Sequence, residues 1–136
     1  MGEFNINLNM NKLRGDLRAY LTQRMTTIVI KMVAFVKTSF GPSNMDGTNP
    51  SEPGQPPNIG TGTLRNNIGF SISGTSDEVV GVYGVLKGPA SDYALRLELG
   101  FYGTDGAGRT YSMEARPYLK PAFNKNKQNI IKWIQG

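Results

Sequence analysis

The chain of 136 residues contains no cysteine and no histidine. Without cysteine there is no disulfide framework and no thiolate chemistry, and a reducing compartment is favoured. Without histidine the protein lacks the commonest general base and the commonest metal ligand. The two absences leave few routes to catalysis, so the sequence predicts a protein that is not an enzyme and has no catalytic residue, metal site or cofactor.

Long apolar runs are also missing. Hydrophobic residues make up 38% of the chain, but no stretch approaches the roughly 20 apolar residues that a membrane span needs. The first residues do not follow the charged, apolar and small-residue order of a signal peptide. We therefore expect a soluble protein inside a cell, or one assembled there, with no membrane partner. The length suits one domain over residues 1–136.

Motifs of hydrolases and nucleotide-binding proteins are absent as well. The sequence has no G-x-S-x-G element, and its adjacent carboxylates, Asp77 and Glu78, fall on a predicted turn where strand alternation points them apart. The glycine-rich run 103–110 lacks the Gly-Lys-Ser/Thr ending of a phosphate-binding loop, so it is expected to be a surface loop. A hydrolytic enzyme is thereby almost excluded.

The net charge of +5 is unevenly distributed along the chain. Residues 1–37 carry a formal charge of +4, residues 38–115 carry −4, and residues 116–136 carry +5. Basic ends around an acidic middle suit head-to-tail contact between copies, in which a basic face of one copy meets an acidic face of the next. The alternative interpretation is two solvated helical faces rich in lysine and arginine.

The clearest predicted element is a long amphipathic helix over residues 10–39. Asn11 is a candidate N-cap, and Gly41-Pro42 is a strong stop signal. The apolar stripe has helical spacing and comprises Leu13, Leu17, Leu21, Met25, Ile28, Met32, Phe35 and Val36. Before it, residues 1–9 alternate in a way that suits a short strand, an ordered arm or a mobile terminus.

The region after this helix is expected to contain two glycine-rich loops and an antiparallel hairpin. Residues 41–62 hold five prolines and five glycines, which indicates a long loop. Alternation then predicts strands over 64–73 and 78–86, with glycines that indicate a bulge or a close backbone approach in the second strand. The second flexible loop is expected over 100–111.

Two helices and a third strand complete the prediction. Residues 93–99 form a short helix capped by Ser91 or Asp92 and ended by Gly100. Residues 110–115 can supply the strand, and Pro117 or Pro121 suits the first turn of a last helix. The fold class is therefore α+β, with a small antiparallel β-sheet packed against a long N-terminal helix, a short middle helix and a C-terminal helix.

Three segments occur in a familiar order: PGQPPNIGTGTLRNNI at 53–68, DYALRLELG at 92–100 and ARPYLKPAF at 115–123. Together they resemble the HK97 gp10-like family of tailed-bacteriophage neck proteins, which are tail completion proteins also described as minor tail or head-tail joining proteins. The structural residues that match the family pattern are Gly62, Leu64, Arg65, Ile68, Tyr93, Glu98, Gly100, Arg116 and Pro117.

The resemblance implies a non-enzymatic virion protein, assembled in the bacterial cytoplasm. Copies would form a ring, expected to be a hexamer, that joins the tail tube or tail terminator to the head connector or stopper protein. DNA would pass through the lumen without sequence-specific binding. The alternative is a small basic nucleic-acid-binding module, because the pI is about 9.6 and the last helix is rich in lysine.

Physical roles can be assigned to some of these residues. Gly62 suits a backbone position with positive φ, and Thr61 can cap that junction through its hydroxyl. Arg65 and Arg116 are candidates to pair with Glu98, or else they are exposed. The two loops either contact neighbouring subunits or are disordered in the free subunit. The candidate interface residues are Pro53, Gln55, Pro56, Pro57, Tyr102, Arg109, Lys125 and Lys127.

Overall fold

The computed structural model describes residues 9–43, 50–59, 62–75, 77–86, 88, 90–104 and 106–136, without the side chain of Asp92. Within these residues the chain is mixed α+β, as the sequence predicts. The elements in chain order are α1 Met10–Ser39, β1 Gly41–Ser43, β2 Asn58–Ile59, α2 Thr63–Asn66, β3 Gly69–Gly74, β4 Val79–Gly84, α3 Ser91–Leu99, β5 Phe101–Thr104, β6 Thr110–Met113 and α4 Leu119–Gln135.

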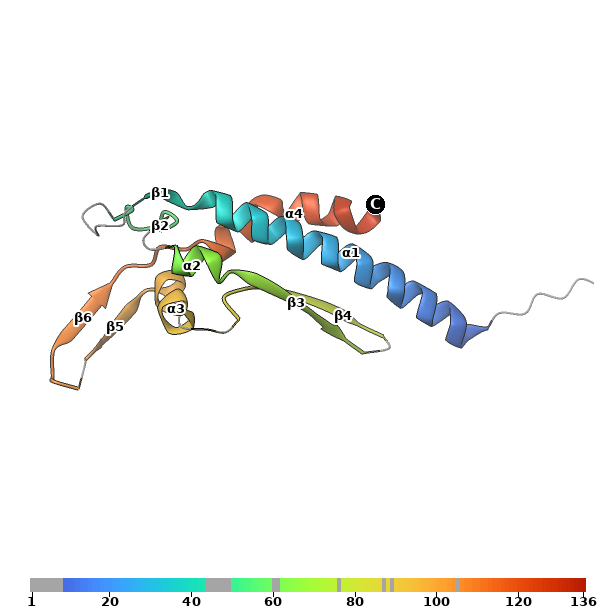
Figure 1. Ribbon diagram of the computed structural model, residues 1–136, viewed down its shortest axis with the longest axis horizontal. Helices are drawn as coiled ribbons and strands as arrows, with labels where there is room; N and C mark the ends of the chain where they lie inside the picture. Colours follow the sequence, from blue (N-terminus) through green and yellow to red (C-terminus); the bar gives the residue numbers. More distant parts are fainter. Residues whose placement is uncertain are drawn as a thin grey trace, which may run out of the picture.

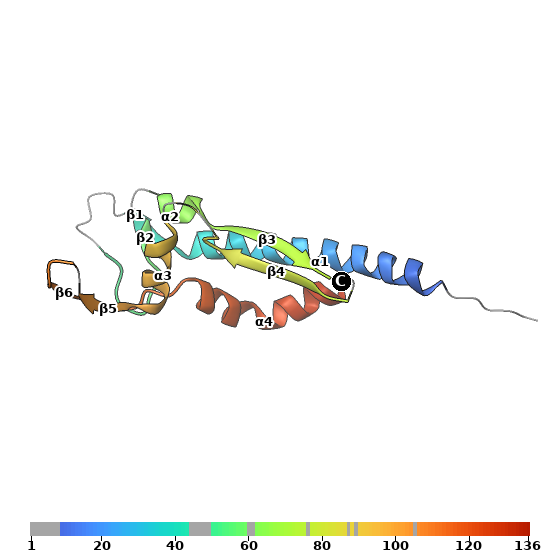
Figure 2. The same cartoon turned by 90° about the horizontal axis from the view of Figure 1, so that it is seen from below.

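The molecule is elongated along α1 (Figure 1). Helix α4 lies beside the C-terminal half of α1, and the β3–β4 hairpin packs along another side of the same helix (Figure 2). The β5–β6 hairpin projects at the end of the molecule opposite the N-terminus of α1 (Figure 1). The N-terminal turns of α1 extend beyond both the hairpin and α4.

The core lies where the C-terminal half of α1 meets α3 and α4. Its buried members are Ile28, Met32, Val36, Ile68, Ala94, Leu97, Tyr118 and Ala122. Of the predicted stripe of α1, Ile28, Met32 and Val36 are core residues, whereas Phe35 is 37% exposed. Leu13 and Leu17, on the same stripe, are 50% and 55% exposed because no described element of the chain covers the first turns of α1.

Helix α1 has the predicted bounds but a different N-cap. The side chain of Asn9, rather than Asn11, accepts a hydrogen bond from the backbone N–H of Lys12 at 3.1 Å. Capping requires a residue just before the first helical turn, and Asn11 lies inside that turn. The helix ends before Gly41-Pro42, as predicted.

The predicted first strand is wrong over its opening residues. Thr63–Asn66 form a single helical turn, and strand β3 begins only at Gly69. Strand β4 pairs with β3 in an unbroken antiparallel register from Gly69–Gly84 to Gly74–Val79, so the hairpin is confirmed and the bulge is not. The close approach predicted from the glycines occurs at Gly81, which packs against Met25 and Val29 of α1.

The two predicted loops also contain regular structure. Strand β1 pairs in parallel with β2 and closes the base of the 41–62 loop. Residues 101–104, expected in a loop, form strand β5, which pairs antiparallel with β6. The third strand therefore belongs to a separate hairpin and does not extend the β3–β4 sheet.

Some sequence predictions lie outside the described residues, namely those for residues 1–8, for Thr61, for the capping side chain of Asp92 and for the loop positions 44–49, 60 and 105. Of the two prolines proposed for the first turn of the last helix, Pro121 lies inside α4 and Pro117 precedes it. None of the helices in the described part of the chain is long and apolar enough to span a membrane.

Candidate functional site

Glu98 joins the second and third matched segments. From α3, its Oε2 accepts the backbone N–H groups of Tyr118 and Leu119 at 2.9 and 3.1 Å, and its Oε1 accepts that of Lys120 at 3.0 Å. The next residue, Pro121, has no N–H to satisfy. One carboxylate thus satisfies the open N–H groups at the start of α4, where the helix dipole also favours negative charge.

The expected ion pairs between Glu98 and the two arginines are wrong. Arg65 donates through Nε to the carbonyl oxygen of Lys37 at 3.1 Å, and Arg116 donates through Nε to that of Ser51 at 2.9 Å. The guanidinium groups of Arg65 and Arg116 thus bind backbone carbonyls, whereas the carboxylate of Glu98 binds backbone N–H groups at the start of α4. Arg65 instead binds one of the last carbonyls of α1, where a helix favours positive charge.

Arg116 anchors the proline-rich segment to the rest of the fold. Its backbone N–H donates to the carbonyl of Leu97 at 2.7 Å, while its side-chain Nε donates to the carbonyl of Ser51. Beside it, the N–H of Gly54 donates to the carbonyl of Ala115 at 2.9 Å. The described part of this loop, residues 50–59, is therefore bound to its own subunit.

Tyr118 completes the link between α3 and α4. The side chain is only 1% exposed, its hydroxyl donates to the carbonyl of Ala94 at 3.1 Å, and its ring packs against Phe40 at a centroid distance of 5.6 Å. Burial, with a smaller contribution from the negative charge of Glu98, raises the pKa of Tyr118 to about 12. The same two causes raise the pKa of Tyr83, whose hydroxyl donates to the carbonyl of Leu119 at 3.1 Å.

We call Ala94, Glu98, Arg116 and Tyr118 the motif hub. These residues come from the second and third matched segments, which hydrogen bonds of Glu98, Arg116 and Tyr118 join. Other matched residues support the hub: Ile68 is buried, Leu64 packs against the core, and Gly62 and Gly100 adopt positive φ of 87° and 79°. Tyr93 differs, because its side chain is exposed.

The sequence contains a signal for the Glu98 cap that the arginine hypothesis overlooks. The region from Arg116 to Gly136 holds no acidic residue, and its start, Arg-Pro-Tyr-Leu, offers no conventional N-capping side chain. An acid from elsewhere in the chain can supply the missing cap, and Glu98 does so.

Most of the candidate interface residues are on the surface. Pro53, Gln55, Tyr102, Arg109, Lys125 and Lys127 are exposed, and Pro56 is half-buried. Pro57 is buried, and its carbonyl accepts the N–H of Gly41 at 3.1 Å, so its assignment to an interface is wrong. This residue closes the base of its loop through the β1–β2 pairing.

The apolar residues of α4 are divided between the core and the surface. Ala122 and Asn126 are buried and Leu119, Ile130 and Trp133 pack against the core, whereas Phe123 and Ile134 are exposed. Lys127 lies over the exposed ring of Phe123, with Nζ 5.7 Å from the ring centroid. The side chain of Asn126 is satisfied within the helix, where it donates to the carbonyl of Ala122 at 2.9 Å.

The N-terminal half of α1 carries the largest run of exposed apolar side chains on one element. We call Met10, Leu13, Leu17, Tyr20 and Leu21 the α1 stripe. All five are at least 37% exposed, and they lie within one helical face. A contiguous exposed apolar surface of this kind marks an interaction site more often than an ordinary solvent face.

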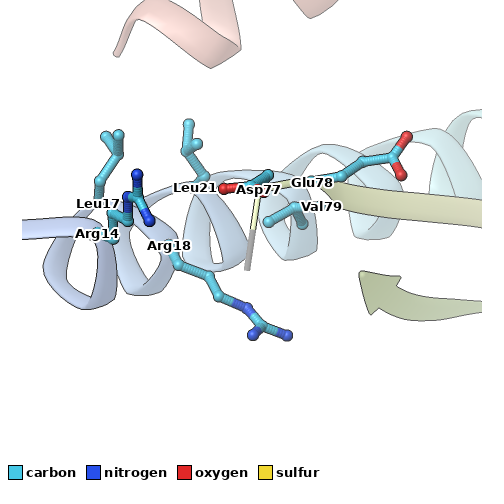
Figure 3. Close-up of a pocket in the computed structure, with 7 residues that line it drawn as sticks. All are labelled: Arg14, Leu17, Arg18, Leu21, Asp77, Glu78 and Val79. Atoms are coloured by element: carbon cyan, nitrogen blue, oxygen red, sulfur yellow. The ribbon is translucent and has the colours of Figure 1, made fainter. Parts of the chain in front are cut away.

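A hollow of about 160 Å³ lies between this part of α1 and the turn of the β3–β4 hairpin (Figure 3). Its lining consists of Arg14, Leu17, Arg18, Leu21, Asp77, Glu78 and Val79. Leu17 and Leu21 point to the same side of the helix, whereas Arg18 points the other way (Figure 3), and its Nη2 lies 3.5 Å from the carbonyl oxygen of Gly74. The adjacent acids Asp77 and Glu78 thus form part of the rim of a partly apolar site.

No group of three or more histidine, cysteine, aspartate or glutamate side chains that could hold a metal ion occurs among the described residues. The chain has no significant match among protein-family models, curated protein sequences or solved structures. The arrangement thus consists of a hydrogen-bonded hub and several exposed apolar side chains.

Proposed function

We propose that the protein is a structural virion protein of a tailed bacteriophage. It forms a ring at the head–tail interface, joins the tail tube or tail terminator to the head connector, and leaves a lumen through which DNA passes. It acts by assembly and performs no reaction. The proposal combines the resemblance of the three sequence segments with the arrangement of their side chains.

The observation that supports it best is the motif hub. Hydrogen bonds of Glu98, Arg116 and Tyr118 join the second and third segments, which are far apart in sequence. The N–H of Gly54 in the first segment donates to the carbonyl of Ala115 in the third. These bonds give several of the matched residues a structural role, as the resemblance implies, and this supports the proposal.

The exposed surfaces provide the second support. An elongated subunit with large apolar side chains exposed at both ends, including Leu17 and Tyr102, suits a protein that buries those side chains in an assembly. Its alternating charge along the sequence suits contact between identical copies. Both properties are expected of a ring-forming subunit.

The direct test is the position of the protein in particles. Cryo-electron microscopy of virions, or antibody labelling of disrupted ones, is expected to place it at the head–tail junction. Its presence only in the baseplate would refute the neck assignment.

A DNA-binding measurement on the isolated subunit distinguishes this proposal from the nucleic-acid-binding alternative. A structural ring protein is expected to show no strong binding to short duplex DNA. Binding that falls steeply as salt rises, and that is lost when Lys125 and Lys127 are both replaced by glutamine, would favour the alternative.

A further inference from the structure

Helix α4 covers only part of the face of α1 on which it packs. The two helices run antiparallel (Figure 2). Lys31 of α1 lies over the ring of Trp133, with its Nζ 4.6 Å from the ring centroid. Two turns nearer the start of α1, the guanidinium of Arg24 lies against Gly136, the residue after α4. From Arg24 to its N-terminus at Met10, α1 continues for about four more turns.

The α1 stripe continues this same face. Residues seven apart lie on the same side of an α-helix, and one such row in α1 comprises Met10, Leu17, Arg24 and Lys31. The last two contact the end of α4, whereas Leu17 and Met10 are 55% and 52% exposed. The stripe is therefore the uncovered continuation of a helix-packing face that α4 occupies farther along α1.

We propose that the α1 stripe binds an amphipathic helix of a different protein, which packs on α1 in line with α4 and carries acidic residues beside its apolar face. Met10 to Leu21 spans about 17 Å, so a partner helix of about three turns covers it. Apolar side chains at helical spacing are the usual anchors of a bound helix. The inference goes beyond the proposed function, because it concerns a partner other than this chain.

The charge of the two long helices predicts an acidic partner. Helices α1 and α4 together carry ten basic side chains and one acidic side chain, Asp16, a formal charge of +9. Adding the two acids of the neighbouring β3–β4 turn, Asp77 and Glu78, still leaves +7. Lys12 and Arg14, in the first turns of α1, are exposed. An acidic helix is therefore attracted to this surface, and a basic helix is repelled.

A second copy of this chain does not fit that description. Helices α1 and α4 are both basic, so either helix of a second copy would bring like charges together. Helix α3 has nine residues, and its described carboxylate, Glu98, already caps α4. No helix in the described part of the chain therefore offers an acidic, apolar face of the required length.

A synthetic acidic helix provides the first test. The probe is a fluorescein-labelled peptide of about three heptads with leucine at a and d and glutamate at e and g, where glutamate repulsion also opposes pairing of the peptide with itself. One matched control replaces the leucines by glutamine, and the other replaces the glutamates by lysine. Fluorescence anisotropy with the full chain is expected to show at least about tenfold tighter binding of the probe than of either control. No binding of the probe up to about 1 mM, or equal binding of the probe and a control, would overturn the inference.

The second test locates the peptide on α1. Leu17→Gln is expected to weaken binding of the probe at least about tenfold. Ala19→Gln is the matched control, because residue 19 is also exposed and lies on nearly the opposite side of the helix. Glutamine is a good helix former, so both variants keep α1 helical. Equal affinities of the two variants for the probe would refute the assignment of the site.

Amide hydrogen exchange gives a readout that does not depend on the label. The probe is expected to slow exchange of residues 10–21 in the wild type and in Ala19→Gln, and to leave it nearly unchanged in Leu17→Gln. Slower exchange confined to α4 would show that the peptide binds elsewhere and would count against the proposal.

Two further measurements address the other occupants. Self-association in sedimentation velocity that is lost in Leu17→Gln would assign the stripe to a second copy. Binding of the chain to phosphatidylglycerol vesicles, without binding to the probe, would assign it to a membrane surface. Either result would overturn the inference.

The outcomes are distinct from those of the particle experiment. A stripe that binds the probe, in a protein found away from the head–tail junction, would leave this inference intact and refute the neck assignment. A protein found at the junction whose stripe binds no acidic helix would refute the inference alone.

Discussion

The carboxylate of Glu98 accepts the backbone N–H of Tyr118 at 2.9 Å, and thereby ties the end of α3 to the start of α4. The same carboxylate also accepts the next two backbone N–H groups. In the other direction, the hydroxyl of Tyr118 donates to the carbonyl of Ala94 in α3. Two residues 20 positions apart thus hold each other's helices in place. The first prediction follows from this relationship.

Glu98→Ala is expected to lower the free energy of unfolding by about 2 kcal/mol, because the start of α4 loses a charged cap that its own residues do not replace. Glu98→Gln keeps one acceptor oxygen and is expected to lose less. Urea denaturation at neutral pH measures both. Glu114→Ala removes an exposed carboxylate in the same region and is the control. A Glu98→Ala variant as stable as this control would contradict the capping role.

The raised pKa of Tyr118 predicts that the folded protein loses stability at alkaline pH. Its pKa is raised to about 12 in the folded protein, whereas an unfolded tyrosine titrates near 10. The folded state therefore holds the proton more tightly, so this contribution to stability is complete below pH 10 and is lost as pH rises from 10 toward 12.

Tyr118→Phe tests that prediction, because phenylalanine cannot ionise. At neutral pH the variant is expected to be less stable by about 1 kcal/mol through loss of the hydrogen bond to Ala94. Above pH 10 its stability is expected to fall less steeply than that of the wild type. Urea denaturation at several alkaline pH values gives the slope. Parallel slopes in the two proteins would contradict the assignment, and Tyr102→Phe, at an exposed site, is the control.

Gly81→Ala is expected to destabilise the protein by about 1–3 kcal/mol through overpacking. A Cβ at this position would lie 2.7 Å from side-chain atoms of both Met25 and Val29, so these side chains or the backbones of α1 and β4 would have to shift. Gly69→Ala, in the same hairpin, is the matched control because its Cβ would meet nothing within 4 Å. Equal melting temperatures of the two variants in thermal unfolding would contradict this close packing.

Arg116→Ala is expected to release the proline-rich segment. The variant loses the bond to the carbonyl of Ser51, at a cost of about 1–2 kcal/mol. Amide hydrogen exchange of residues 50–59 should become faster, while exchange in α1 stays close to the wild-type rate. The control, Lys120→Ala, removes an exposed positive charge nearby. It should change neither the exchange of residues 50–59 nor that of α1. Unchanged protection of residues 50–59 would show that the segment is held by other contacts.

Local sequence signals predict several elements well. Helical spacing and the Gly41-Pro42 stop give the bounds of α1, alternation gives the β3–β4 hairpin, and Gly100 ends α3 with positive φ. These features depend on backbone preferences and on apolar periodicity within a few residues. The same signals do not distinguish Thr63–Asn66 from a strand, because a single helical turn is too short to establish a period.

The sequence by itself determined the α+β fold class, the bounds of α1 and the β3–β4 hairpin. Only the tertiary structure decided how Glu98, Arg65 and Arg116 pair, because each chooses among partners that are distant along the chain. It also decided that the apolar stripe of α1 is core at Ile28, Met32 and Val36 and surface from Leu13 to Leu21. Periodicity shows that a face is apolar, but only the surrounding elements determine whether that face is covered within the subunit.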